Sequence, residues 1–362
     1  MRVLFLTPGP EENASARHRV YQFVPYIQAA GVQCIISPAL SKTLYRKVFL
    51  RRTWMQQIGY WFFVSVTRMR DLLRVRNFDL IFMQREVLSR LFPVFELAIA
   101  CLNPKIVFDL DDNLFRIPYA NDRGLLYRLG CRIFVDRHNI ERIVRESKVV
   151  VIGSPYLLDY VRPHNQNVVV IPTAVDLQKY TPRKHTQACS ITIGWIGSAS
   201  TSVYLHSMSE VFQQLAERFG NKIRFIIIGD PNFEPLIPQM HIKPFVLEKE
   251  INDLHEMDIG IMPLDDNEWT RGKCAFKAIQ YMAIGIPVVS SPVGVAQDIV
   301  RHGENGYLAK DTEDWVYYLS LLIEDADLRQ HLGKNGRQLV EQYYSVQAVF
   351  PKLLELLKEA AE

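Results

Sequence analysis

The sequence lacks any paired-cysteine motif. Its five cysteines are odd in number, widely spaced and never arranged as C-x-x-C. This pattern indicates neither a disulfide framework nor a zinc site. It favours a protein that works in a reducing compartment.

Long apolar runs are also missing. The first apolar stretch, residues 3–6, is too short for the core of a signal peptide. The two longest runs, residues 60–66 and 97–102, fall far short of the roughly 20 residues that span a bilayer. We therefore expect a cytoplasmic protein, with peripheral attachment at the inner face of the membrane left open.

A strong excess of charge of either sign is absent. The chain carries 42 basic and 39 acidic residues, a net charge of +3 over 362 residues. A balance this close to neutral argues against nucleic acid as a partner.

The length of the chain exceeds what one ordinary hydrophobic core uses, so it predicts two domains. No internal repeat or low-complexity tract is found.

The chain alternates short aliphatic segments with amphipathic ones, which is typical of the βαβ units of a parallel sheet. Helices are expected over residues 19–30 and 348–361, among others. The alternation breaks near residues 168–172, where a polar stretch rich in proline begins. The expected strands cover residues 3–6, 34–37, 80–83, 106–110, 149–152, 191–196, 224–229, 259–263 and 288–290. The predicted domains are 1–172 and 191–343, joined by a linker at 173–190 and followed by a helix, 344–362, that docks back on the first domain.

The most informative stretch is residues 269–306. Arg271 and Lys273 lie in a predicted polar loop, and apolar positions at helical spacing then predict a helix over 275–284. Gly285 ends that helix, and a short buried strand follows. A helix N-terminus with free amides and added cations suits phosphate. This order of elements predicts a nucleotide-diphosphate site.

Two strand ends suggest further phosphate contacts. Gly9 follows the first strand and lets the backbone pass close to a ligand, although a tight turn explains this glycine at least as well. After the strand at 191–196, Gly197, Ser198 and Thr201 offer amides and hydroxyls to phosphate oxygens. Neither loop contains G-x-G-x-x-G, which argues against a Rossmann dehydrogenase.

Three motifs, in order along the chain, resemble those of glycosyltransferase family 4. The family's E-A-M-A-x-G-x-P-V-V is matched by residues 280–289, its I-P-N-G-V-D by 171–176 and its G-x-N-G-x-L by 303–308. The resemblance implies an α/β protein with two Rossmann-like domains facing each other across a cleft, the GT-B architecture. It implies an acceptor-binding first domain and a nucleotide-sugar-binding second domain.

The activity implied by this resemblance is that of a hexosyltransferase. The enzyme would transfer a sugar, with retention of configuration, from a nucleotide-diphosphate donor, with UDP as the default. The acceptor would be a hydroxyl of a glycan, a lipid-linked molecule or a small molecule, as in cell-envelope polysaccharide or glycan biosynthesis.

The donor site departs from the family pattern. The family carries two glutamates eight residues apart, where this chain has Gly272 and Gln280. Gln280 still offers an amide to ribose hydroxyls. The candidates for the missing carboxylate are Asp265, Asp266 and Glu268. The family's phosphate-binding Arg and Lys after the first strand of this domain are also absent. The expected donor contacts are therefore Gly9, Gly197, Ser198, Thr201, Gly229, Val246, Arg271, Lys273 and Gln280.

Three clustered aspartates form a second candidate site. Asp109, Asp111 and Asp112 resemble the D-x-D-x-T motif of haloacid-dehalogenase phosphatases, in which Asp109 would attack phosphorus. Asn113 in place of the threonine, and a position far from the first strand, argue against that interpretation. In a glycosyltransferase, Asp109 and Asp111 would instead fix sugar hydroxyls or the acceptor while Lys273 stabilises the leaving diphosphate. A helix N-cap would also account for one of these aspartates.

A subset of the family pairs such an F-D-x-D-D segment with an S-x-R-x-R-like element, matched here by residues 15–19. The predicted acceptor contacts are Arg17, Arg19, Arg85 and Asp112. We expect no metal and no cofactor, because the predicted diphosphate site on Lys273 lies about one domain away from the D-x-D.

A basic aromatic segment covers residues 42–76. It carries nine basic residues against one acid, Asp71, and seven aromatic residues. Such a segment suits an anionic membrane that presents a lipid-linked acceptor. It fits a surface helix pair with its aromatic side in the core equally well.

Two other functions also stay open for the protein as a whole. They are a nucleotide-sugar-binding protein without turnover and a GT-B-fold epimerase.

Overall fold

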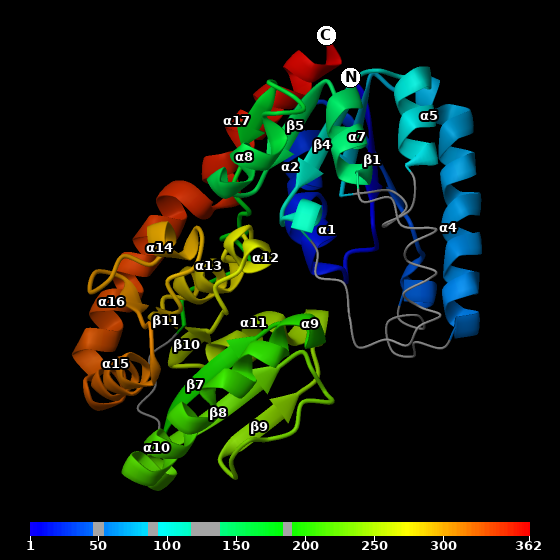
Figure 1. The fold of residues 1–362 in the computed structure, drawn as a ribbon. Helices are drawn as coiled ribbons and strands as arrows, with labels where there is room; N and C mark the ends of the chain where they lie inside the picture. Colours follow the sequence, from blue (N-terminus) through cyan, green and yellow to red (C-terminus); the bar gives the residue numbers. More distant parts are fainter. Residues whose placement is uncertain (46–53, 86–92, 117–137, 184–189) are drawn as a thin grey trace. The chain divides into compact units, whose positions relative to one another are not determined.

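The protein is described by a computed structural model that covers residues 1–45, 54–85, 93–116, 138–183 and 190–362. Its contacts divide the chain into two compact units (Figure 1). The first unit comprises Met1–Thr173 and Val349–Glu362, and the second comprises Ala174–Ala348. Each unit holds a six-stranded sheet in which every pairing is parallel. The expected two-domain α/β class is confirmed.

The first sheet has the order β2-β1-β3-β4-β5-β6. Its strands are β1 Arg2–Thr7, β2 Gln33–Pro38, β3 Leu80–Gln84, β4 Ile106–Leu110, β5 Val149–Ile152 and β6 Val168–Val170. Strands β3 and β4 are buried throughout, as aliphatic strands covered on both faces should be. Strand β6 corrects the sequence analysis, which placed the end of the regular pattern at these residues.

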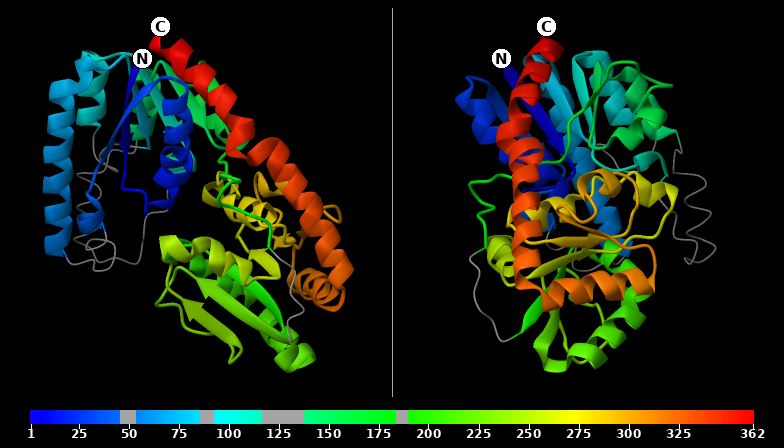
Figure 2. Two further views of the ribbon diagram at one scale, coloured as in Figure 1. Left: turned by 180° about the vertical axis from the view of Figure 1, so that it is seen from behind. Right: turned by 90° about the vertical axis from the view of Figure 1, so that its left-hand side faces the viewer.

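Helices and short 3₁₀ turns connect the strands of the first unit (Figure 2). They are α1 Ala14–Arg19, η1 Tyr21–Phe23, α2 Val24–Ala29, α4 Trp54–Arg74, η2 Val75–Asn77, α5 Val94–Leu102, η3 Leu114–Arg116, α7 Asn139–Glu146, η4 Pro155–Leu157 and α8 Leu158–Val161. The single helix expected over 19–30 is wrong. Pro25 lacks an amide hydrogen and fits only the first turn of a helix, so a new helix starts at Val24.

The last helix, α17 Val346–Ala361, packs its C-terminal part on the first unit. Leu353, Leu356 and Leu357 are buried on one side of it. Phe350 lies 5.8 Å from Tyr26 between ring centroids. The helix thus completes the core of the unit that holds the N-terminus.

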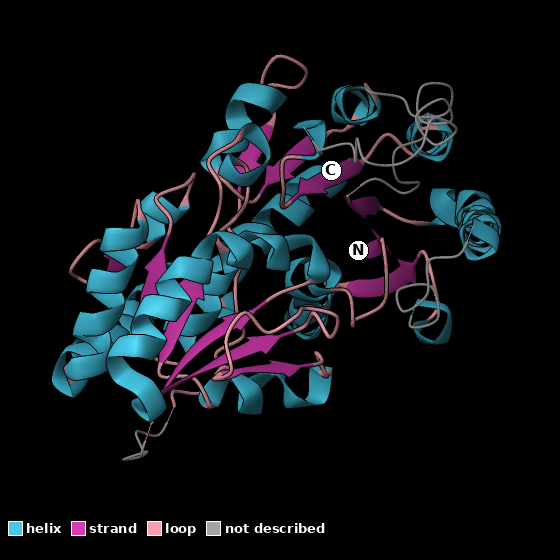
Figure 3. Ribbon diagram, turned by 60° about the horizontal axis from the view of Figure 1, so that its bottom comes forward, coloured by secondary structure: helices cyan, strands magenta, loops and turns pink. Residues whose placement is uncertain are grey.

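The second sheet has the order β12-β11-β10-β7-β8-β9 and is flanked by helices (Figure 3). Its strands are β7 Ile191–Ile196, β8 Ile223–Ile228, β9 Met240–Lys243, β10 Ile259–Met262, β11 Val288–Ser290 and β12 Gly306–Leu308. Its helices are α9 Ala199–Ser202, η5 Val203–Met208, α10 Ser209–Phe219, η6 Gly220–Lys222, η7 Leu247–Lys249, α11 Glu250–His255, α12 Glu268–Arg271, α13 Phe276–Ala283, α14 Ala296–Ile299, α15 Thr312–Glu324, α16 Ala326–Leu339 and the π-helix η8 Val340–Tyr344.

Each sheet has a topological switch point, where the chain reverses the direction in which it adds strands. It lies between β1 and β3 in the first unit and between β7 and β10 in the second. Open parallel sheets bind ligands at the carboxyl ends of the strands beside this point. The fold alone therefore directs attention to the ends of β1, β3, β7 and β10.

Candidate functional sites

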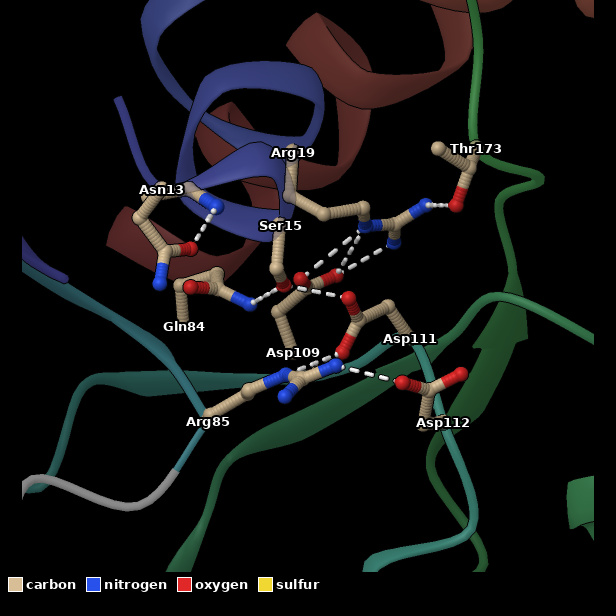
Figure 4. Close-up of polar contacts among 10 residues, drawn as sticks. Asn13, Ser15, Arg19, Gln84, Arg85, Asp109, Asp111, Asp112 and Thr173 are labelled. Atoms are coloured by element: carbon tan, nitrogen blue, oxygen red, sulfur yellow. Dashed lines mark hydrogen bonds and ion pairs between the residues drawn. The ribbon is translucent and has the colours of Figure 1, made fainter. Parts of the chain in front are cut away.

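The site of the first unit lies at the carboxyl ends of β3 and β4 (Figure 4). The Ser15 hydroxyl, on α1, donates a hydrogen bond to Asp111. Gln84, the last residue of β3, donates from Nε2 to the Ser15 oxygen at 2.7 Å. The structure thus brings together the S-x-R-x-R and F-D-x-D-D segments, which are about 90 residues apart in the sequence.

Arg85 holds two of the aspartates. Its Nε donates to Asp111 at 2.5 Å and its Nη2 donates to Asp112 at 2.6 Å. Burial opposes ionisation of Asp111, but the charge and hydrogen bonds of Arg85 and the Ser15 hydroxyl offset it and hold the pKa of Asp111 below its ordinary value. Arg85 adopts a left-handed backbone with φ of 60°. Backbone strain of this kind is concentrated at functional sites.

Arg19 and Asp109 form a buried, bidentate ion pair. The same guanidinium donates to the carbonyl oxygen of Ile171 at 2.8 Å. Burial raises the pKa of Asp109, and Arg19 opposes that shift. Arg17 is also buried and donates to the carbonyl oxygen of Glu11. Asp109 and Arg19 are therefore satisfied by each other, while Arg85 and Asp112 are the partly exposed members of the site.

Gly9, expected at the donor, lies in the loop after β1. Its carbonyl oxygen accepts a hydrogen bond from the Thr7 hydroxyl at 2.8 Å. A Cβ atom at position 9 would lie 3.0 Å from the Tyr45 ring. These contacts match the tight turn that the sequence analysis gave as the alternative to a ligand contact.

The site of the second unit begins at the loop after β7. Gly197 is packed so tightly that a Cβ atom there would lie 2.6 Å from the Trp195 ring and 2.7 Å from Cε of Lys277. The Ser198 and Ser200 hydroxyls are 2.8 Å apart. Gly229, after β8, has φ of 108° and lies against the Gly197 backbone. The loop is a close-packed glycine turn edged by hydroxyl groups, the kind of backbone that approaches a phosphate.

Lys277 is a residue that the sequence analysis missed. It lies in the first turn of α13, and its Nζ is 3.5 Å from the Thr201 hydroxyl and 5.3 Å from the centroid of the Trp195 ring. It therefore brings a positive charge to the loop after β7, at the switch point. A basic residue in the first turn of the predicted helix was the available signal.

Of the two cations expected at the phosphate, Lys273 lies in the predicted loop before α13, whereas Arg271 does not. Arg271 is the last residue of α12 rather than part of a loop, and it forms an ion pair with Asp266 at 2.5 Å. Lys273 lies over the ring of Trp269, 4.6 Å from its centroid. The residue before α13, Ala275, has a left-handed backbone with φ of 48°. Val246, another expected donor contact, precedes η7 and is half-buried.

Gln280 takes part in a buried polar triad. Its Nε2 donates to the Tyr180 hydroxyl at 2.9 Å and to Glu250 Oε1 at 3.0 Å, and the Tyr180 hydroxyl donates to the same oxygen at 3.2 Å. All three side chains are buried. A carboxylate thus lies beside position 280, but it comes from α11 and not from the three residues considered in the sequence analysis.

No group of three or more His, Cys, Asp and Glu residues with metal-binding geometry occurs within the described ranges. No described helix is long and apolar enough to cross a membrane.

Comparison with known proteins identifies a domain in the second unit. Residues 190–325 match the family described as "Glycosyl transferases group 1". The chain is 24% identical over 176 residues to the capsular polysaccharide biosynthesis glycosyltransferase CapM of Staphylococcus aureus, and the match covers 45% of each protein. It is 21% identical over 301 residues to N-acetyl-alpha-D-glucosaminyl L-malate synthase of Bacillus anthracis, covering 71% of this chain and 78% of the relative. The chain thus spans about half the length of CapM.

Solved structures with the same two-domain fold cover almost the whole chain. Anabaena HepE in complex with UDP and glucose superposes with a TM-score of 0.68 at 14% identity, over 99% of this chain and 100% of HepE. A glycosyltransferase from Rickettsia africae superposes with a TM-score of 0.69 at 15% identity, over 100% of this chain and 98% of that one. Both similarities support the GT-B fold.

Proposed function

We propose that this protein transfers a sugar, with retention of configuration, from a nucleotide-diphosphate donor to a hydroxyl acceptor. The observation that carries the proposal is Lys277 beside the tight Gly197 loop, at the switch point of a sheet within the matched glycosyltransferase domain. UDP is the expected nucleotide, as in the HepE complexes with UDP and with UDP-glucose. The CapM similarity favours an acceptor in polysaccharide biosynthesis, either a glycan or a lipid-linked molecule.

In the proposed reaction, the bond between the sugar C1 and the diphosphate oxygen breaks, and a bond from C1 to the acceptor oxygen forms on the same face. The acceptor proton passes to the departing diphosphate. Lys277, with the amides and hydroxyls of residues 197–201, would stabilise the negative charge that develops on the leaving group. Lys273 and Arg271 are secondary candidates for this role, because their contacts are with Trp269 and Asp266, whereas those of Lys277 are with the strand end and the loop at Trp195 and Thr201.

The first unit would bind the acceptor through the partly exposed Arg85 and Asp112. The buried Arg19–Asp109 pair would act as a positioning element that fixes α1 to β4, with Asp111 held between Arg85 and Ser15. Arg17, which is buried, would support the same helix. In this mechanism, transfer from the donor would require no metal ion and no cofactor.

The phosphatase alternative finds little support. A nucleophilic aspartate has to reach phosphorus, whereas Asp109 is fully buried and bound on both oxygens by Arg19. The epimerase and the binding protein without turnover remain competitors, since both would use the same donor site.

A panel of UDP, GDP, ADP and CMP sugars in a thermal-shift experiment tests donor binding, because a ligand of the native state raises apparent stability. Donor hydrolysis and transfer are then followed by nucleotide release and sugar analysis. Release of UDP, together with a product in which the sugar C1 keeps the configuration that it has in the donor, supports the proposal. Interconversion of donor sugars without nucleotide release would identify an epimerase, and binding without any turnover would identify a binding protein.

A further inference from the structure

Helix α4 of the first unit carries an apolar stripe that no other described element covers. Its exposed members follow one another at helical spacing, with exposed fractions between 45% and 83%. They are Phe62, Phe63, Val66, Met69 and Leu73. These five make up more than half of the large apolar side chains that are exposed in the described chain. A clustered apolar surface of this kind marks an interaction site.

The charges on α4 select one type of partner. Arg70 and Arg76, at the C-terminal end of the helix and just beyond it, are exposed. The only acid of the helix, Asp71, is buried. Helix α4 therefore combines exposed apolar side chains with positive charge and carries no exposed carboxylate among its described residues. This combination complements the anionic headgroups and the apolar interior of a bilayer surface.

The rotation of α4 about its axis is fixed by a buried arginine. Arg68 donates to the carbonyl oxygens of Thr7 and Ser37 at 2.8 and 2.9 Å, at the ends of β1 and β2. It also forms an ion pair with Asp71 at 3.1 Å. Because Arg68 points into the unit, the side chains on the opposite face of the helix point outward. Figure 2 shows α4 at the margin of the first unit.

The sequence analysis left two interpretations of this segment open, and the structure divides the aromatic residues between them. Tyr45 and Tyr60 pack against the small core formed by Ala39, Leu40 and Val64. Phe62 and Phe63 lie outside that core and are exposed. Phe49 and the basic residues from 46 to 52 lie outside the described residues, and they carry no part of the argument.

We propose that α4 docks the first unit on the surface of an anionic lipid bilayer. The apolar stripe would enter the boundary between headgroups and acyl chains, and Arg70 and Arg76 would bind anionic headgroups. Through Arg68, the docked helix would hold the end of β1, and with it the Gly9 loop, at a fixed position relative to the membrane. This proposal does not depend on the transfer reaction, because it concerns a surface and not the donor site.

The test is co-sedimentation of the full chain with two kinds of vesicle, phosphatidylcholine alone and phosphatidylcholine mixed with phosphatidylglycerol, at low and high salt. We expect binding to the mixed vesicles that weakens as salt rises. Val66→Ser combined with Leu73→Ser should lower the partition coefficient roughly tenfold or more. Tyr317→Ser, an exposed apolar position on α15 of the other unit, is the matched control and should leave it unchanged.

A second pair of variants tests the charges. Arg70→Gln combined with Arg76→Gln should lower binding to the anionic vesicles about tenfold at low salt. Lys222→Gln, an exposed position in the second unit, is its control. Equal urea midpoints for all variants would exclude loss of folding as the cause.

Absence of binding to the anionic vesicles would overturn the proposal. Binding that neither variant pair changes would also overturn it. A dimer in sedimentation velocity that the Val66→Ser and Leu73→Ser pair dissolves would identify a second copy of the chain as the occupant instead. Donor binding by thermal shift is measured in parallel, so a failure of this proposal is distinguishable from a failure of the proposed transfer.

Discussion

Gly229 faces the backbone of Gly197 so closely that a Cβ atom at position 229 would lie 1.9 Å from the Gly197 carbonyl oxygen. The two glycines follow neighbouring strands, β8 and β7, which are paired in register up to Ile228 and Ile196. The loop at the proposed donor site therefore keeps its shape only while position 229 has no side chain.

Gly229→Ala should lower the free energy of unfolding by about 2–4 kcal/mol, because a backbone clash adds to the strain of φ at 108°. Donor-dependent thermal stabilisation should also be lost. Gly220→Ala is the matched control, since Gly220 has φ of 53° but a Cβ atom there would meet nothing within 4 Å. It should cost only about 1–2 kcal/mol. If urea unfolding shows the same loss of stability for Gly229→Ala and Gly220→Ala, the backbone strain alone, and not the clash with Gly197, sets the cost at position 229.

Lys277→Met should lower kcat/KM for transfer, because it removes one preorganised stabiliser of the leaving diphosphate. The expected increase in the activation free energy is about 2–4 kcal/mol. Methionine keeps the apolar stem that packs on Gly197. Lys273→Ala, at the cation that the sequence analysis assigned to this role, serves as the comparison. If Lys273→Ala has the larger effect on initial rates, the leaving-group role belongs to Lys273 and the present assignment is reversed.

Gln280→Glu restores the glutamate of the family pattern, yet it should destabilise this protein by about 1–3 kcal/mol at neutral pH. The new carboxylate would lie beside Glu250, whose Oε1 is 3.0 Å from Gln280 Nε2, and two adjacent carboxylates cannot both ionise at low cost. The pair would share a proton with a raised pKa, so the loss of stability should shrink as pH falls.

The matched control for that prediction is the exchange variant Gln280→Glu with Glu250→Gln. It keeps one carboxylate and one amide in the triad, and its urea midpoint should return close to that of the parent protein. A single Gln280→Glu variant with the same midpoint as the parent at pH 5 and pH 8 would contradict the prediction.

Asp109→Asn should cost about 3–5 kcal/mol of stability, because it leaves the buried Arg19 guanidinium without its counter-charge. The double variant Arg19→Met with Asp109→Leu should recover much of that loss. A positioning role predicts that activity follows stability in both variants. If the double variant folds well but has no activity, measured by kcat at saturating donor, one member of the Arg19–Asp109 pair acts directly on a substrate.

Ala275→Gly should raise the free energy of unfolding by about 0.5–1 kcal/mol, because glycine adopts φ of 48° without the steric cost that alanine incurs. Ala278→Gly, at a buried helical position of the same helix, is the control and should lower stability by at least about 1 kcal/mol. Chemical unfolding of both variants measures these two changes in the free energy of unfolding. A destabilised Ala275→Gly variant would mean that the methyl group of Ala275 contributes more to packing than the backbone strain costs.

The sequence predicts most strands because their aliphatic residues form short, buried runs. Strands β4, β5, β7 and β11 have the expected bounds. The three missed strands are only three or four residues long. Strand β6 consists of three valines, which the sequence analysis assigned to the break in the regular pattern, whereas β9 (MHIK) and β12 (GYL) carry little of the aliphatic signal that marks a strand. Where burial is partial, pairing with a neighbouring strand decides the conformation, and one strand's own residues do not reveal it.

The sequence predicts the gathering of Arg19, Asp109 and Asp111 only in part. Parallel strands place their carboxyl ends on one edge, so the meeting of the two segments follows from the fold class. Which arginine pairs with which aspartate depends on side-chain packing. The contacts of Lys277 with Thr201, and of Gln280 with Glu250, join elements 76 and 30 residues apart and depend on how α13 lies against its neighbours.

The return of α17 to the first unit makes the second unit an insertion within the first. Residues 174–348 form one continuous segment of the chain, whereas the first unit consists of two separate segments. Lys352, near the end of the chain, donates to the carbonyl oxygen of Val170 at 3.1 Å. The last two turns of α17 bury Leu356, Leu357 and Ala360, so a tag or fusion that unwinds them would weaken the half of the protein that was synthesised first.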